Sequence, residues 1–157
     1  MRKIFWLFLC AAAMAQEPAP QATFQPAGNM SQLMINILYP TSNAIFYVER
    51  NPPKTQTDWN ELQNQAMMLA ESGNLLMMPG RVRDQGDWIK DSKLVVDAGM
   101  AAFKLARAKD LPGIVALNDQ LYTACVTCHE QYRADYRRRR QAQDKAAEKI
   151  LQEKSKQ

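Results

Sequence analysis

The sequence predicts an all-α protein folded as an antiparallel four-helix bundle. Between residues 30 and 132, four segments carry apolar residues at steps of three and four, the spacing typical of amphipathic helices. Turns rich in proline and glycine separate these segments, and no segment shows the sustained two-residue alternation expected of a strand. Because most of the turns are short, consecutive helices are expected to pack antiparallel around a core that can hold a cofactor.

The first helix is expected to begin near Met30, after a proline-rich, polar linker over residues 16–27. Pro40 lies within it. Proline removes one backbone hydrogen bond and clashes with the preceding turn, so a kink or a break is expected there. The proline pair at residues 52–53 ends the segment. Its stripe comprises Met30, Leu33, Met34, Ile37, Leu38, Thr41, Ile45 and Val48.

The second helix is expected to follow Thr57, a residue type that caps helix N-termini, and to stop by the Pro79-Gly80 pair. The third helix is expected over about residues 87–109. Its acidic residues come early and its basic residues late, which is the order that the helix dipole favours. Residues 50–57 are expected to form the long connection of the bundle.

The fourth helix is expected to follow a turn at residues 110–113, and its apolar stripe includes Cys125 and Cys128. These cysteines belong to the run Cys-Val-Thr-Cys-His, which ends at His129. A Cys-x-x-Cys-His run is the pattern of covalent c-type haem attachment. Thiols three residues apart share one helix face, from which they can form thioethers to the two haem vinyl groups, with His129 as the proximal ligand. The run predicts one covalently attached haem c, with its iron, per chain.

Two other uses of a cysteine pair fit the sequence less well. A thioredoxin-like redox pair needs a βαβ context, and no strand is predicted. A structural zinc site needs four ligands, whereas His129 is the only histidine in the chain. The same scarcity excludes a second histidine ligand from this chain, so the other face of the iron must meet Met, Lys, water or nothing.

The N-terminus has the pattern of a secretory signal peptide over residues 1–15. Arg2 and Lys3 precede a short apolar run, and Ala13-Met14-Ala15 forms a small-residue cleavage site. The run is too short to span a bilayer, so no stable membrane insertion is expected. Cleavage would remove Cys10 and leave only the two cysteines of the motif. We therefore expect an exported, periplasmic protein.

Residues 137–157 form a basic tail that begins with four consecutive arginines, Arg137 to Arg140. Without Arg2 and Lys3 the chain has 18 basic and 16 acidic residues, of which nine basic and four acidic ones lie in residues 133–157, so the rest of the chain is mildly acidic. The tail is expected to be a solvated extension of the fourth helix or a frayed end. Its charge suits an acidic redox partner or anionic lipid head groups. Export argues against a nucleic-acid partner.

Residues 28–136 resemble the cytochrome c-prime family. The likeness rests on the leader, the four helices, and Cys-x-x-Cys-His on the last helix followed by Tyr132-Arg133. The family commonly has an aromatic and then a basic residue at those places, close to the proximal side of the haem. The resemblance implies that Arg133 tunes the charge near the haem. It also implies an exported haem protein, which in this family often forms a homodimer through the first two helices.

The resemblance implies one of two functions. In one branch of the family a methionine of the first helix ligates the iron, and the protein is a low-spin electron carrier. In the other branch this position is apolar and the five-coordinate iron binds NO or CO. Met34 matches the ligating methionine by position, and Met30, one turn away, is its alternative. We therefore expect a one-electron carrier that serves redox partner proteins, with a gas-binding haem protein as the alternative.

We expect no enzymatic activity. The sequence has no Ser-His-Asp set, no Cys-His nucleophile and no phosphate-binding glycine loop. A haem peroxidase is disfavoured because no second histidine is available for acid–base chemistry on the distal side.

Overall fold

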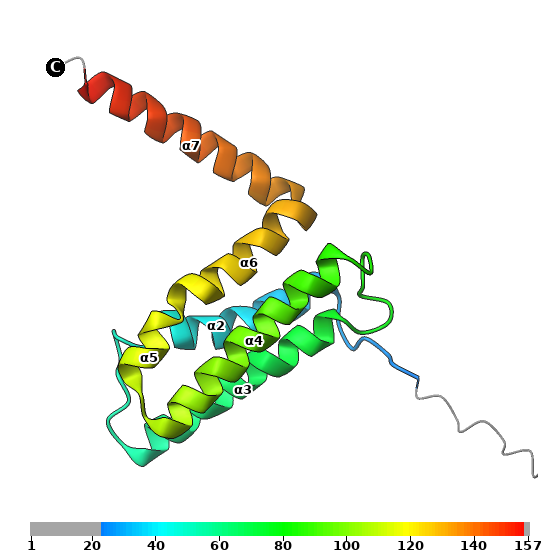
Figure 1. Ribbon diagram of the computed structural model, residues 1–157. Helices are drawn as coiled ribbons and strands as arrows, with labels where there is room; N and C mark the ends of the chain where they lie inside the picture. Colours follow the sequence, from blue (N-terminus) through cyan, green and yellow to red (C-terminus); the bar gives the residue numbers. More distant parts are fainter. Residues whose placement is uncertain (1–22, 156–157) are drawn as a thin grey trace, which may run out of the picture.

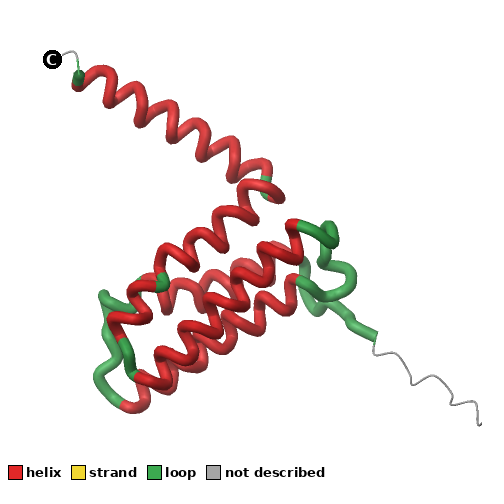
Figure 2. The backbone as a smooth tube through the Cα atoms, in the orientation of Figure 1, coloured by secondary structure: helices red, strands yellow, loops and turns green. Residues whose placement is uncertain are grey.

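The computed structural model describes residues 23–155 (Figure 1). The predicted signal peptide of residues 1–15, Cys10, and the linker as far as residue 22 lie outside the described residues. Within the described range the chain is helical and has no strand (Figure 2). The prediction of an all-α helical bundle is confirmed at this level.

The first predicted helix is a run of three successive elements. They are α1 (Met30–Leu33), the π-helical element η1 (Met34–Leu38) and α2 (Tyr39–Phe46). The side chain of Asn29 caps α1 by accepting a hydrogen bond from the backbone N–H of Gln32 at 2.9 Å. The segment with the predicted apolar spacing is therefore helical, as expected.

The helix neither breaks nor stops at Pro40. The turn before it widens into η1, in which the Tyr39 N–H donates to the carbonyl oxygen of Met34, five residues back. The wider turn accommodates the proline ring, which crowds an ordinary α-helical turn. The Thr41 hydroxyl donates to the carbonyl oxygens of Ile37 and Leu38, at 2.7 and 3.1 Å.

The two long helices α3 (Gln56–Leu76) and α4 (Asp87–Ala108) lie side by side (Figure 1). The close approach depends on glycine. A Cβ atom on Gly99 would lie 2.4 Å from the backbone nitrogen of Ala70, so only glycine fits there without a shift of the backbone. Gly73 is similar, since a Cβ atom there would lie 2.6 Å from a Val96 methyl group.

The N-terminus of α3 corrects one prediction. Its N-cap is Thr55 and not Thr57. The Thr55 hydroxyl accepts from the Asp58 N–H, and the Asp58 carboxylate accepts from the Thr55 N–H, which together form a capping box. The N–H of Lys54 also donates to Asp58, and these backbone bonds lower the pKa of that carboxyl. The reciprocal bonding explains why the helix begins two residues earlier than predicted.

The connections also differ from the prediction of one long loop at residues 50–57. Two connections are long, at residues 47–55 and 77–86. The second is tied to the bundle at its ends, because the indole N–H of Trp88 donates to the carbonyl oxygen of Leu76 at 2.9 Å.

The fourth predicted helix is divided into α5 (Leu111–Ala116) and α6 (Asn118–Tyr132), which meet at Leu117. The predicted turn at residues 110–113 is the start of α5. Asp110 accepts a hydrogen bond from the Gly113 N–H. Proline is tolerated in the first turn because backbone N–H groups there have no acceptor within the helix, so the N–H that proline lacks is not missed.

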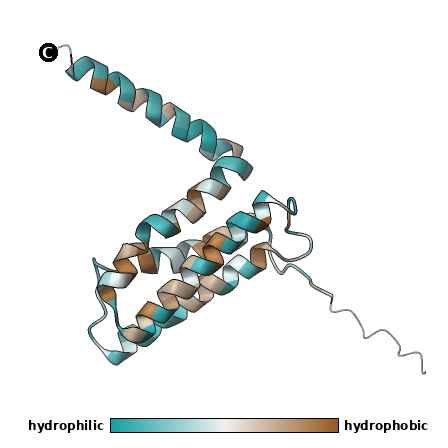
Figure 3. Cartoon of the chain, in the orientation of Figure 1, coloured by the Kyte–Doolittle hydropathy of each residue, from teal (hydrophilic) through white to brown (hydrophobic). Residues whose placement is uncertain are grey.

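The tail forms a separate helix, α7 (Ala134–Lys154), which leaves the end of α6 at an angle (Figure 1). Arg133 between them is extended, with φ −121° and ψ 90°, so the tail does not continue the fourth helix. The surface of α7 is mostly hydrophilic and none of its residues is buried (Figure 3). The tail is therefore solvated, as expected. It forms a helix of its own that is separated from α6 by the extended Arg133.

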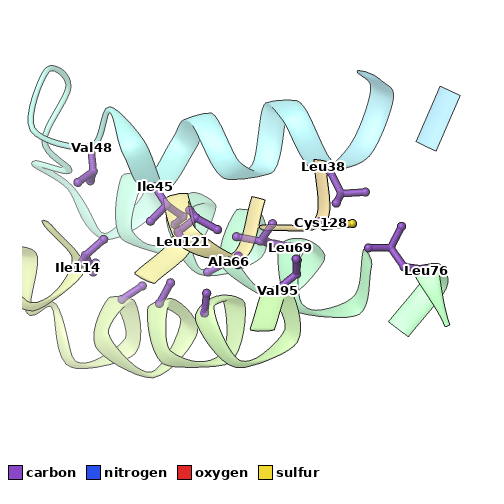
Figure 4. Packing of buried hydrophobic residues seen from close by; sticks show 14 of the residues in the cluster. Leu38, Ile45, Val48, Ala66, Leu69, Leu76, Val95, Ile114, Leu121 and Cys128 are labelled. Carbon is purple, nitrogen blue, oxygen red and sulfur yellow. The ribbon is translucent and has the colours of Figure 1, made fainter. Parts of the chain in front are cut away.

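The core lies between the first helix, α3, α4 and α6, where their apolar stripes meet (Figure 4). Cys128 belongs to this buried cluster, with Leu38 from the first helix, Leu69 from α3 and Val95 from α4. Within residues 23–155, no helix combines the length and the apolar character needed to cross a membrane.

Candidate functional site

The Cys-x-x-Cys-His run lies on α6 with its cysteines toward the interior. Cys128 is 8 % exposed, Cys125 and His129 are half-buried, and the intervening Thr127 is exposed. The helix is anchored by Leu121, which is 1 % exposed and lies one turn before Cys125. The apolar period of α6 therefore turns both thiols toward the core.

Both cysteines and His129 line a cavity of about 370 Å³, a volume within the range of cofactor sites. The first helix, α3, α4 and α6 all contribute to its wall. The wall is mainly apolar. Its apolar residues include Met34, Leu38, Phe46, Leu69, Leu76, Val95 and Ala124, and the polar ones include Ser42, Asn43, Asp91 and Arg133.

A second cavity of about 290 Å³ adjoins the first and shares Met34, Cys128, His129 and Arg133 with it. Met30 lines the second cavity but not the first. The structure thus brings all the predicted site residues to one region. Met34 reaches it from the first helix, Cys125, Cys128 and His129 from α6, and Arg133 from the link between α6 and α7. Their roles toward a haem stay predictions.

The environment of the two thiols is apolar. Burial raises the pKa of Cys125 to about 11, and burial followed by the nearby charge of Asp91 raises that of Cys128 to about 11. Catalytic cysteine pairs have the opposite property, a lowered pKa that favours the thiolate. The two thiols are therefore unlike a thioredoxin-type pair.

The surroundings of His129 favour the neutral imidazole, which is the form that binds a metal ion. Its pKa is lowered by burial and then by the positive charge of Arg133, so the imidazole is neutral at pH 7. The backbone N–H of Arg133 donates to the carbonyl oxygen of His129 at 3.0 Å. Within residues 23–155, no three His, Cys, Asp or Glu side chains cluster as ligands for a metal ion.

A polar contact that the sequence did not indicate joins the end of α6 to the start of α4. The Tyr132 hydroxyl donates to the Asp84 carboxylate, which also accepts from the Trp88 N–H at 3.1 Å. The rings of Trp88 and Tyr132 meet edge to face with centroids 4.9 Å apart. The hydrogen bond from Tyr132 is the main cause of the lowered pKa of Asp84. This contact positions the end of the helix that carries His129.

Asp91 is the second residue that sequence reasoning missed. It lies on α4, is 2 % exposed, and lines the same cavity as the two cysteines. The sequence could have indicated it only by position, because Asp91 is a charged residue on the otherwise apolar stripe of that helix, between Trp88 and Val95. A carboxyl group at such a position is either partnered or functional.

Comparison of the chain with protein-family models, curated proteins and solved structures finds no match. What the fold and the site define is a helical bundle with a Cys-x-x-Cys-His run beside an apolar cavity.

Proposed function

We propose that the chain is an exported, periplasmic c-type cytochrome that carries one electron on a single covalent haem. In this proposal the first helix, α3, α4 and α6 form an antiparallel four-helix bundle of the cytochrome c-prime type. The observation that carries the proposal is one cavity, mainly apolar, lined by Cys125, Cys128 and His129 from α6 and by Met34 from the first helix.

The donor set and the cavity fit a haem c. Cys125 and Cys128 supply the two thiols for covalent attachment, and the neutral imidazole of His129 supplies the nitrogen for the iron. When bound, haem supplies a reversible one-electron iron couple. The wall is mainly apolar, and Arg133 places a positive charge near His129.

Met34 is proposed as the second protein ligand. It is half-buried and lines both cavities together with His129, whereas Met30 lines the smaller one but not the larger. A thioether ligand opposite a histidine raises the reduction potential of the iron, which suits an electron carrier. The proposal therefore assigns Met34 to the iron and Met30 to packing.

A homodimer is part of the proposal. The first helix exposes two large side chains, Ile35 at 64 % and Tyr39 at 65 %, four residues apart and thus on one face. Both side chains also line the larger cavity, so part of this face would contact a bound haem. The dimer is proposed because the resemblance to the cytochrome c-prime family implies one through the first two helices.

Absorption spectra of the oxidised and reduced protein, with and without CO, test the proposed function. An electron carrier with two protein ligands should be low-spin in both states and should not bind CO readily. A high-spin spectrum with unhindered CO binding would instead support the alternative, a gas-binding haem protein with an open distal side.

Removal of the basic tail after Tyr136 should slow electron exchange with an acidic redox protein by about tenfold or more at low ionic strength. The truncation removes Arg137 to Arg140 and the rest of α7, whose charge is exposed. It also breaks the Arg140–Glu130 ion pair of 3.0 Å, which is too exposed to contribute much stability. Stopped-flow kinetics at several salt concentrations measure the effect.

The matched control for the tail is Lys104→Gln, which removes one exposed positive charge from α4. Its exchange rate should stay close to that of the wild type. Haem content should be unchanged in both variants. Equal rates for the truncated and full-length proteins at low ionic strength would show that the tail does not guide the partner.

A further inference from the structure

Asp91 is a buried acid in the wall of the cavity. It is 2 % exposed, and its Oδ2 atom has no hydrogen-bond partner among residues 23–155. No ion pair within this range includes Asp91. The cavity that it lines also holds Cys125 and Cys128, and its charge acts on Cys128.

The protein around Asp91 does not compensate a negative charge. Burial is the main cause of its raised pKa, and the carboxylates of Asp87 and Asp84 add to it. Lys90 acts in the opposite direction but is itself exposed, so solvent screens much of its charge. Among the residues of the cavity wall, Arg133 is the one with a fixed positive charge, and it is exposed, so solvent screens it as well.

Packing does not require a carboxyl group at this position. The neighbours on the same stripe, Trp88 and Val95, are apolar and buried, while the adjacent Ser92 satisfies its hydroxyl by donating to the Trp88 carbonyl oxygen at 2.8 Å. A buried carboxylate without a partner is unfavourable, and native proteins usually supply one. Burial favours the neutral carboxyl, so Asp91 is held ionised only when the cavity contains a positively charged partner.

We infer that Asp91 is the counter-charge that stabilises the oxidised form of the cofactor held in this cavity. The inference rests on the proposed function. A ferric haem carries one more positive charge than a ferrous haem. In a haem-loaded protein, one electron from a redox partner protein would remove that charge and leave the carboxylate without its partner. Asp91 thereby opposes reduction and lowers the midpoint potential, as charges near a poorly solvated haem do.

The test is the midpoint potential of the haem-loaded Asp91→Asn variant, measured by spectroelectrochemical titration. Asparagine keeps the shape of the side chain and removes the charge, so the potential should shift to a more positive value. Asp91→Ser is a second uncharged variant, because a serine can bond a backbone carbonyl as Ser92 does, and it should shift in the same direction. The control Asp97→Asn removes an exposed charge from the same helix and should leave the potential unchanged.

Thermal unfolding of the same proteins separates an electrostatic role from a structural one. If either variant had a changed melting temperature but kept the midpoint potential of the wild type, the inference would be overturned. Loss of haem from both variants would assign Asp91 to folding and would overturn it as well. Both results leave the proposed function intact, because the wild-type protein still carries its haem. A wild-type protein without covalent haem would contradict the proposed function itself.

Discussion

Replacing Met34 by alanine is expected to convert low-spin iron to high-spin iron that binds CO readily. Met34 lines both cavities beside His129, and an alanine side chain is too short to replace its sulfur. Loss of the thioether should also lower the reduction potential, because this ligand favours the reduced iron. Absorption spectra of both oxidation states, followed by titration with CO, measure the change.

Met30→Ala is the matched control for this experiment. Met30 has the same side chain, lies one turn away, and lines the smaller cavity but not the larger. This variant should stay low-spin and resist CO. If Met30→Ala became high-spin and Met34→Ala did not, Met30 would be the ligand. If the iron of the wild-type protein were already high-spin, Met34 would be a packing residue and the gas-binding function would be favoured.

Replacing both Cys125 and Cys128 by alanine is expected to abolish covalent attachment and to leave the chain largely unfolded. The haem would fill a cavity of about 370 Å³ bounded by the first helix, α3, α4 and α6. Domains of this size are stable by only about 5–15 kcal/mol, so removing a cofactor-sized part of the core is enough to unfold one. Haem content after acid–acetone extraction and helix content by circular dichroism measure the two effects.

Thr127→Ala is the control for the cysteine variants, because Thr127 lies within the same motif but is exposed. Its hydroxyl donates to the Thr123 carbonyl oxygen of its own helix, at 2.8 Å. Haem content and helix content should match those of the wild type. A double cysteine variant that still carried covalent haem would contradict the assignment of the thiols.

The helices could be predicted because each one buries an apolar stripe and the chain marks most of their ends with proline or glycine. The third helix ends within one residue of its prediction, at Ala108, where Lys109 takes the left-handed conformation. Local hydrogen bonding explains where the structure differs from the prediction. The Thr55–Asp58 capping box moves the start of α3. At Pro40, where a kink or a break was predicted, the helix does not break, and a π-helical turn accommodates the proline.

Only the part of the candidate site whose chemistry requires a fixed spacing along the chain could be predicted from the sequence. The proposed haem attachment requires two thiols and a histidine within five consecutive residues, so Cys125, Cys128 and His129 were apparent as candidates from the sequence, and the structure places all three on the wall of one cavity. The contact between Tyr132 and Asp84 joins residues 48 positions apart, and no local pattern indicates it. Asp91 likewise acquires its significance from burial, which arises only when α4 packs against its neighbours.

The most direct test of the account is the mass of the purified protein, produced by export in a host that matures c-type cytochromes and then extracted with acid–acetone. We expect a chain that begins after residue 15 and retains one haem, with neither Cys125 nor Cys128 available to a thiol reagent after unfolding. A folded, helical protein without haem, in which both thiols react on unfolding, would contradict it.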